Sequence, residues 1–239
     1  IECSLNKVFA TEVLDHVVDE GVQIHGGYGF MQEYEIERAY RDSRINRIFE
    51  GTNEINRLLV PNTFVRKAFK GELPLLEATQ GLQEEIMMFI PEIPGEEPLA
   101  LQKYLVKNAK KIALMSAGLA LQKYGNELEH EQEILVNFAD MVSHVYAMES
   151  AILRTEKAIE RDGLEKSRQK LLYTEIFCQE AFNKIEQDAK ETLVAVTEGD
   201  QLMMMMSALR KLTRHNPINV IAKKREAADQ IIASEKYVV

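Results

Sequence analysis

Three stretches of this chain place apolar side chains alternately four and three residues apart, and this spacing limits the possible folds more than any other feature. On an α-helix it forms a single apolar stripe, and such stripes pack helices against one another at shallow angles. Residues 99–239 are therefore predicted to form an up-and-down helical bundle. The stripe residues are Leu101, Leu105, Ile112, Met115 and Leu119, then Ile134, Phe138, Met141, Val145, Met148 and Ile152, then Cys178, Phe182, Ile185, Ala189 and Val196.

The composition points to an all-α protein and excludes several classes of function. Good helix formers dominate the 239 residues, and there are only 12 Gly and 6 Pro. The net charge of −9 argues against general nucleic-acid binding. Cys3 and Cys178 show no paired spacing, so we expect packing roles, no metal cluster and a reducing compartment. No apolar run approaches the roughly 20 residues that span a bilayer.

Proline placement divides the chain. Four of the six prolines fall between residues 71 and 98, namely Pro74, Pro91, Pro94 and Pro98. We predict a first domain over 1–72, a Pro-rich connection over 73–98 with one short helix at about 75–90, and the bundle domain over 99–239. Within the bundle, a helix is expected at about 200–213, and Asn216-Pro217 is expected to cap and open the last helix.

The first domain is predicted to hold three helices and two breaks. Helices are expected at 1–25, 34–47 and about 54–70. Gly26, Gly27 and Gly29 end the first helix in a tight turn. The second break is Phe49-Glu50-Gly51-Thr52-Asn53, where Thr52 or Asn53 can cap the helix that follows.

Glu50 is the candidate catalytic residue. It follows the apolar pair Ile48-Phe49, which would desolvate its carboxylate and raise its pKa toward that of a general base. Gly51 has no side chain and would let a ligand approach the backbone. The helix behind it favours an anion or a polarised carbonyl. The simpler alternative, a solvent-facing Glu at a helix start, is favoured by the local pattern alone.

The glycine turn is ambiguous when taken alone. Gly26-Gly27-x-Gly29 can be a helix C-terminus, or a loop that cradles a pyrophosphate. It is not a dinucleotide-binding fingerprint, because no strand precedes it and the spacing differs.

Together, at this spacing, the two breaks resemble the C-terminal signature of the acyl-CoA dehydrogenases. The resemblance covers residues 23–57 and is best for the very-long-chain branch, which carries an extra helical domain after the dehydrogenase core. The bundle domain matches that appended domain in placement and helicity only. The residues that carry the motif are Gln23, Gly26, Gly27, Gly29, Phe30, Glu33, Arg38, Arg41 and Asp42, followed by Phe49-Glu50-Gly51-Thr52-Asn53.

The resemblance implies a role for each site residue. Glu50 would remove the α-proton of a fatty acyl-CoA while a hydride passes from the β-carbon to FAD, giving trans-2-enoyl-CoA in β-oxidation. Its backbone N–H, with a flavin ribityl hydroxyl, would polarise the thioester carbonyl. Phe49 and Gly51 would contact the substrate. The cofactor contacts would come from Thr52, Asn53 and Glu54 and, toward the FAD of the neighbouring subunit, from Gln23 and Gly27.

The resemblance also sets expectations for the whole protein. Because the chain starts at Ile1 within the pattern, we expect the C-terminal part of a larger flavoenzyme, inactive alone, and we leave open whether it binds FAD. The expected partners are an electron-transfer flavoprotein and a second subunit in a homodimer. The expected location is the bacterial cytoplasm or the mitochondrion. An acyl-CoA oxidase and a non-catalytic helical interaction or dimerisation module remain as alternatives.

Two further features of the bundle domain are open to more than one interpretation. The run Met203 to Met206 is expected to be a buried, adaptable helix face, with contact to a lipid or acyl chain as the alternative. The basic clusters at 107–111, 210–215 and 223–225 are expected to be solvated faces, with peripheral membrane contact as the alternative.

Overall fold

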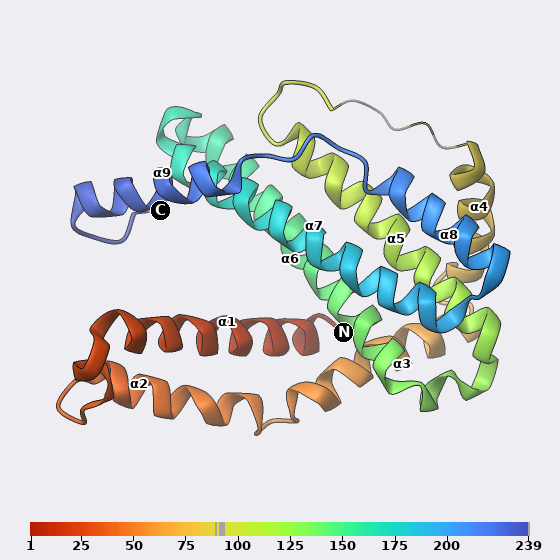
Figure 1. Cartoon of the computed structure of the whole chain (residues 1–239), viewed down its shortest axis with the longest axis horizontal. Coiled ribbons are helices and arrows are strands. Elements are labelled where there is room, and N and C mark those ends of the chain that lie inside the picture. The colour runs from red at the N-terminus through yellow and green to blue at the C-terminus, as the bar shows by residue number, and fades with distance from the viewer. Residues whose placement is uncertain (89, 91–93, 239) are drawn as a thin grey trace. The chain divides into compact units, whose positions relative to one another are not determined.

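The computed structural model describes residues 1–88, 90 and 94–238, which form helices joined by turns and loops with no strand among them (Figure 1). This confirms the predicted all-α class. The chain divides into two compact units. One comprises Ile1–Leu73 with Glu129–Ala139, and the other comprises Pro74–Leu128 with Asp140–Val239.

The first unit is built around its longest helix, α1. This helix contacts both α2 and α3 (Figure 1). Its apolar face is only partly buried, since Leu5 and Val8 are each 5% exposed whereas Val17 is 58% exposed. The elements are α1 (Glu2–His25), η1 (Gly26–Phe30), α2 (Glu35–Arg44), η2 (Ile45–Arg47) and α3 (Asn53–Phe69).

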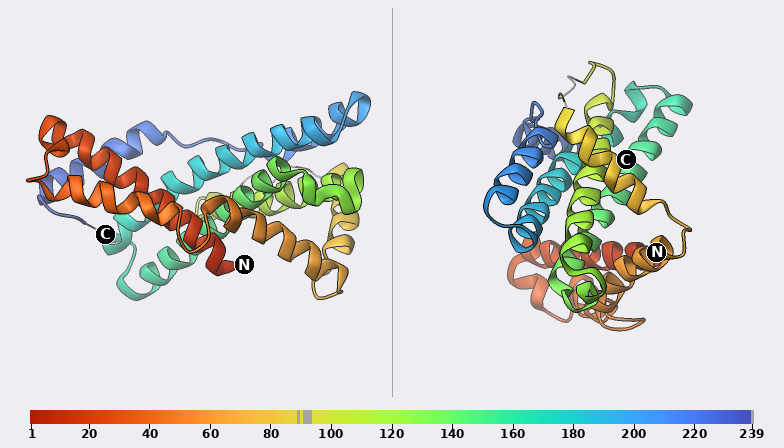
Figure 2. Two further views of the ribbon diagram at one scale, coloured as in Figure 1. Left: turned by 90° about the horizontal axis from the view of Figure 1, so that it is seen from below. Right: turned by 90° about the vertical axis from the view of Figure 1, so that its right-hand side faces the viewer.

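The second unit holds the predicted bundle, with α5 and α7 in extensive contact and α8 packed against both (Figure 2). The remaining elements in chain order are α4 (Leu75–Met88), α5 (Ala100–Tyr124), η3 (Gly125–His130), α6 (Gln132–Asp162), η4 (Glu165–Ser167), α7 (Arg168–Val196), α8 (Gly199–Leu212) and α9 (Val220–Ser234).

Two ion pairs show that α5 and α6 run in opposite directions. Lys103 pairs with Glu156, and Lys110 pairs with Glu149, so the residue number rises along α5 as it falls along α6. The apolar stripes of α5 and α7, together with the part of the α6 stripe from Met141 onward, form the core of this unit. Its least exposed large side chains include Ile112, Met141, Met148, Phe182 and Ile185, each at 0%.

Of two predicted helix starts, one is confirmed and one is wrong. Thr52 is the N-cap of α3, because its hydroxyl accepts a hydrogen bond from the Ile55 N–H at 3.2 Å. The predicted start of the last helix at Asn216-Pro217 is wrong. That helix begins at Val220, because the side chain of Asn219 caps it by accepting from the Ala222 N–H at 3.0 Å.

The methionine run is also not the buried face that we predicted. Met203 is 70% exposed and Met204 is 55% exposed. The reason is the position of α8 at the edge of the bundle, where Ala208, Leu209 and Leu212 supply its buried face instead.

The domain limits at 72, 98 and 239 stay predictions. The short helix predicted at about 75–90 is α4, whereas Pro91 lies outside the described residues. No helix among the described residues is long and apolar enough to cross a membrane. The described part of the chain also contains no group of three or more His, Cys, Asp or Glu placed to hold a metal ion.

Candidate active site

The turn between η2 and α3 holds the candidate base in an unusual backbone conformation. Glu50 has a φ of 55°, and Gly51 follows with a φ of 78°. The left-handed conformation costs a residue with a side chain about 1–2 kcal/mol. Such a conformation persists where surrounding contacts stabilise it, and it is frequent at functional sites.

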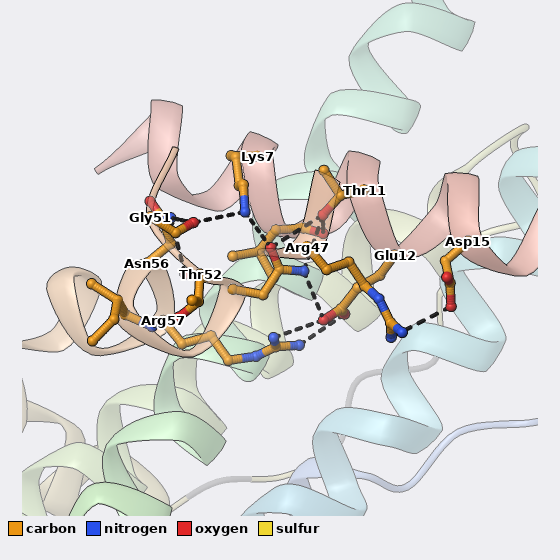
Figure 3. Close-up of polar contacts among 12 residues, drawn as sticks. Lys7, Thr11, Glu12, Asp15, Arg47, Gly51, Thr52, Asn56 and Arg57 are labelled. Carbon is orange, nitrogen blue, oxygen red and sulfur yellow. Dashed lines mark hydrogen bonds and ion pairs between the residues drawn. The ribbon is translucent and has the colours of Figure 1, made fainter. Parts of the chain in front are cut away.

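Two side chains hold the carbonyl groups of this turn (Figure 3). Lys7, from α1, donates to the Gly51 carbonyl oxygen at 2.8 Å. The amide of Asn56 donates to the same oxygen at 2.8 Å and to the Thr52 carbonyl oxygen at 3.1 Å. The turn is therefore fixed from α1 on one side and from the first turn of α3 on the other.

Asn53 connects the turn to the interior of the first unit. Its side chain is 2% exposed. Its Oδ1 accepts from Lys7 Nζ at 2.7 Å, and its Nδ2 donates to Glu12 Oε1 at 3.2 Å. The Thr11 hydroxyl lies 3.0 Å from that Nδ2. The amide faces the protein, so we assign the Asn53 side chain to the support of the turn rather than to a cofactor.

A bidentate ion pair between Arg57 and Glu12 stabilises this network. Arg57 donates from Nη1 and Nη2 to the two carboxylate oxygens of Glu12, at 2.7 and 2.8 Å. Burial raises the pKa of the Glu12 carboxyl, but the hydrogen bonds and charge of Arg57, aided by Asn53 and Arg47, outweigh burial and lower that pKa overall. Glu12 is therefore held as an anion (Figure 3).

The first turn of α3 carries a second ionised carboxylate. The pKa of Glu54 is lowered, chiefly by a hydrogen bond with its own backbone amide and also by the Thr52 hydroxyl and the charge of Arg57. The Thr52 hydroxyl therefore contacts both Glu54 and Ile55, because it also accepts a hydrogen bond from the Ile55 N–H. Glu54 is exposed, whereas Thr52 is half-buried.

Glu50 itself lies open in this chain. Its side chain is exposed, and those of Ile48 and Phe49 are 49% and 48% exposed. The apolar pair therefore does not bury the carboxylate, contrary to the expectation from sequence, because both apolar side chains face solvent beside it.

Gln23 and Gly27 lie far from the turn that holds Glu50. Lys7 marks the turn on α1, and roughly 24 Å of helix separates Lys7 from Gln23 at the usual rise per residue. The side chain of Gln23 is exposed, and a Cβ built at Gly27 would meet no atom within 4 Å. The structure thus gathers Phe49, Gly51, Thr52 and Glu54 around Glu50 and leaves Gln23 and Gly27 at the other end of α1.

Sequence analysis did not identify the residues that support the turn. Lys7, Thr11, Glu12 and Arg57 act through contacts that are more than 40 residues apart in the chain. The one available signal was their spacing, which places Lys7 and Thr11 on the same face of a predicted helix.

The residues predicted to hold FAD fit that role in part. Gln23, Gly27 and Glu54 are exposed, and the space beside Gly27 is open to a ligand. The buried Asn53 side chain does not fit, because Lys7, Thr11 and Glu12 already bind it. The residues that fit the expectation therefore lie in two separate places, at the Glu50 turn and at the end of α1.

Comparison with known proteins agrees with the motif. Two family models, each described as "Acyl-CoA dehydrogenase, C-terminal domain", match residues 1–63 and 108–211. The chain is 72% identical over its full length to a Bacillus subtilis protein named "Probable acyl-CoA dehydrogenase", and it spans 40% of that protein. It is 29% identical, over 90% of its length, to the rat mitochondrial very long-chain specific acyl-CoA dehydrogenase, of which it covers 35%.

A solved structure agrees over the whole chain. The crystal structure of an acyl-CoA dehydrogenase complexed with FAD from Bacillus anthracis superposes with a TM-score of 0.97 at 74% identity. The superposition covers 100% of this chain and 40% of that one. This chain therefore belongs to the acyl-CoA dehydrogenase family and corresponds to its C-terminal helical part.

Proposed function

We propose that the chain supplies the catalytic base of an FAD-dependent acyl-CoA dehydrogenase that converts a long-chain fatty acyl-CoA to its trans-2-enoyl-CoA. Glu50 is the proposed base, with Phe49 and Gly51 beside the substrate. The observation that carries the proposal is the left-handed conformation of Glu50, in a turn held by Lys7 and Asn56 within a family motif. Strain of this kind, supported by a dedicated network, is typical of a functional turn.

Each residue of the turn has a proposed part in the reaction. Glu50 takes the α-proton onto its carboxylate, and its backbone N–H polarises the thioester carbonyl, which acidifies that proton. Gly51 lets the thioester approach the backbone. FAD, when bound, supplies the acceptor for the hydride that leaves the β-carbon.

The exposure of Glu50 defines what the proposal requires. A base for an α-proton works best when its pKa is near the operating pH, and desolvation raises the pKa of a carboxyl. Because Glu50, Ile48 and Phe49 are exposed here, the bound acyl-CoA and the rest of the whole protein would have to exclude water from the carboxylate. We therefore expect the 239-residue chain to be inactive alone.

The cofactor contacts are proposed at both ends of α1. Thr52 and Glu54 would contact one FAD beside Glu50. Gln23 and Gly27, at the far end of the helix, would contact the FAD of a second subunit, which favours a homodimer. Electrons would pass from the whole protein to an electron-transfer flavoprotein.

The test is the reduction of bound flavin by palmitoyl-CoA in the whole protein, as wild type, Glu50→Gln and the control Glu72→Gln. Glu72 is exposed and lies outside the motif. Rapid bleaching of wild type and control, with a Glu50→Gln variant that binds FAD and substrate without bleaching, would support Glu50 as the base. Equal bleaching in all three would place the base elsewhere. A protein that binds no FAD would favour the alternative of a helical interaction module.

A further inference from the structure

The second unit contains a cavity of about 510 Å³ that the proposed reaction does not use. Its walls come from α4, α5 and α8, and they are mainly apolar. This volume lies within the range of small-molecule sites, which are typically apolar with a few polar groups. The apolar lining consists chiefly of Leu82, Ile86, Met115, Leu119, Met204 and Met205.

Two contacts fix α4 beside α5 and so define the cavity. A Cβ at Gly118 would lie 2.2 Å from Thr79 Cγ2, so the two helices approach closely there. Six residues further along α4, Glu85 accepts from Lys111 Nζ at 2.5 Å. Leu82 lies between these two contacts in the chain, which gives the α4 wall of the cavity a fixed position.

The α8 wall of the cavity accounts for one of the two exposed methionines, Met204. Met204 lines the cavity and is 55% exposed, and Met205 beside it is half-buried. Methionine side chains are flexible and polarisable, and they adapt to irregular apolar ligands. An exposed methionine beside a half-buried one in the wall of an apolar cavity favours contact with a ligand over simple packing.

A lysine side chain also lines this cavity. Lys211, in the last turn of α8, lines the cavity with an exposed side chain. None of the ion pairs found among the described residues involves it. A positive charge beside an apolar cavity matches an amphiphile with an anionic head and an alkyl tail.

We propose that this cavity binds a free long-chain fatty acid, with its alkyl chain against the methionine wall and its carboxylate near Lys211. A methylene group occupies about as much volume as a water molecule, ~30 Å³, so the cavity has room for a chain of roughly a dozen carbons or more. The site is separate from the Glu50 turn and does not depend on the reaction proposed there.

The experiment is titration calorimetry of the 239-residue chain with dodecanoate, below its aggregation concentration, and with dodecan-1-ol as the uncharged control. Met204→Asp is compared with Met203→Asp, because both residues are exposed neighbours and only Met204 lines the cavity. Lys211→Met is compared with Arg210→Met on the same principle, since Arg210 is exposed and does not line it.

We expect saturable binding of one dodecanoate per chain. Met204→Asp should weaken it about tenfold or more, because a carboxylate in the wall would be desolvated by the tail, and Met203→Asp by less than about twofold. Lys211→Met should weaken dodecanoate about fivefold and leave dodecan-1-ol unchanged, whereas Arg210→Met should change neither by more than about twofold.

Four results would overturn the proposal. The first is the absence of saturable binding, and the second is equal weakening by the two methionine variants. The third is binding to anionic phospholipid vesicles without binding of dodecanoate, which would identify a membrane surface. The fourth is a dimer in sedimentation that Met204→Asp dissociates while no dodecanoate binds, which would assign this face to a second copy of the chain.

Discussion

Lys7 donates one hydrogen bond to the Gly51 carbonyl oxygen at 2.8 Å and another to Asn53 Oδ1 at 2.7 Å. One ammonium group thus binds both sides of the residue that caps α3, Thr52. Lys7, located more than 40 residues earlier in the sequence, is therefore one of the α1 side chains that fasten the turn that carries Glu50.

We expect Lys7→Met to lower the free energy of unfolding by about 1–2 kcal/mol, because hydrogen bonds from a charged donor to the turn and to a buried amide are lost. The measurement is urea denaturation followed by circular dichroism. Lys70→Met, at an exposed lysine near the end of the first unit, is the control and should change stability by less than about 0.5 kcal/mol. Equal effects of the two variants would show that the Lys7 contacts do not stabilise the turn.

Gly51→Ala should destabilise the chain more than Gly71→Ala. Both glycines have a positive φ, 78° and 71°, so each substitution costs about 1–2 kcal/mol of backbone strain. At Gly51 the new Cβ would also lie 2.9 Å from Asn56 Nδ2, whereas at Gly71 it would meet nothing within 4 Å. The difference between the two denaturation midpoints measures this contact, and no difference would mean that Asn56 moves aside without cost.

Acid should destabilise the first unit through Glu12. Because the pKa of this carboxyl is lowered on folding, the unfolded chain takes up its proton first as the pH falls below the usual value of 4.5. The stability supplied by the Glu12 charge is present above that pH and is lost as the pH falls through the lowered pKa. Denaturation curves between about pH 6 and 3 should be flatter for Glu12→Gln than for wild type. A slope unchanged from wild type would exclude Glu12 as a source of the acid sensitivity.

The two cysteines should react at very different rates. Burial raises the pKa of the Cys178 thiol to about 12, whereas Cys3 is exposed. Since the thiolate is the reactive form, iodoacetamide at pH 8 should label Cys3 in the native chain and Cys178 only after denaturation. Mass spectrometry of the labelled peptides gives the answer, and rapid native labelling of Cys178 would contradict its burial.

The raised pKa of Cys178 should also make the fold less stable above the usual thiol pKa of 9.0, because the thiol ionises in the unfolded chain and stays protonated in the folded one.

The sequence determined the all-α class, the long helices and the residues that form their core. Helix formation and burial follow from local composition and spacing. The apolar stripes that contain Ile112, Met141 and Phe182 could therefore be recognised without a structure. The Thr52 cap and the family motif are also local features, because their residues are neighbours in the chain.

Only the tertiary structure decided how the candidate site is supported. The contacts of Lys7, Glu12 and Arg57 join segments whose separation in sequence leaves no periodic signal. The exposure of Glu50 and of Met204 depends on which helix faces are covered by neighbouring helices, and composition does not specify that. The capping of α9 by Asn219 rather than by Asn216 likewise depended on which of two competing caps the fold selects.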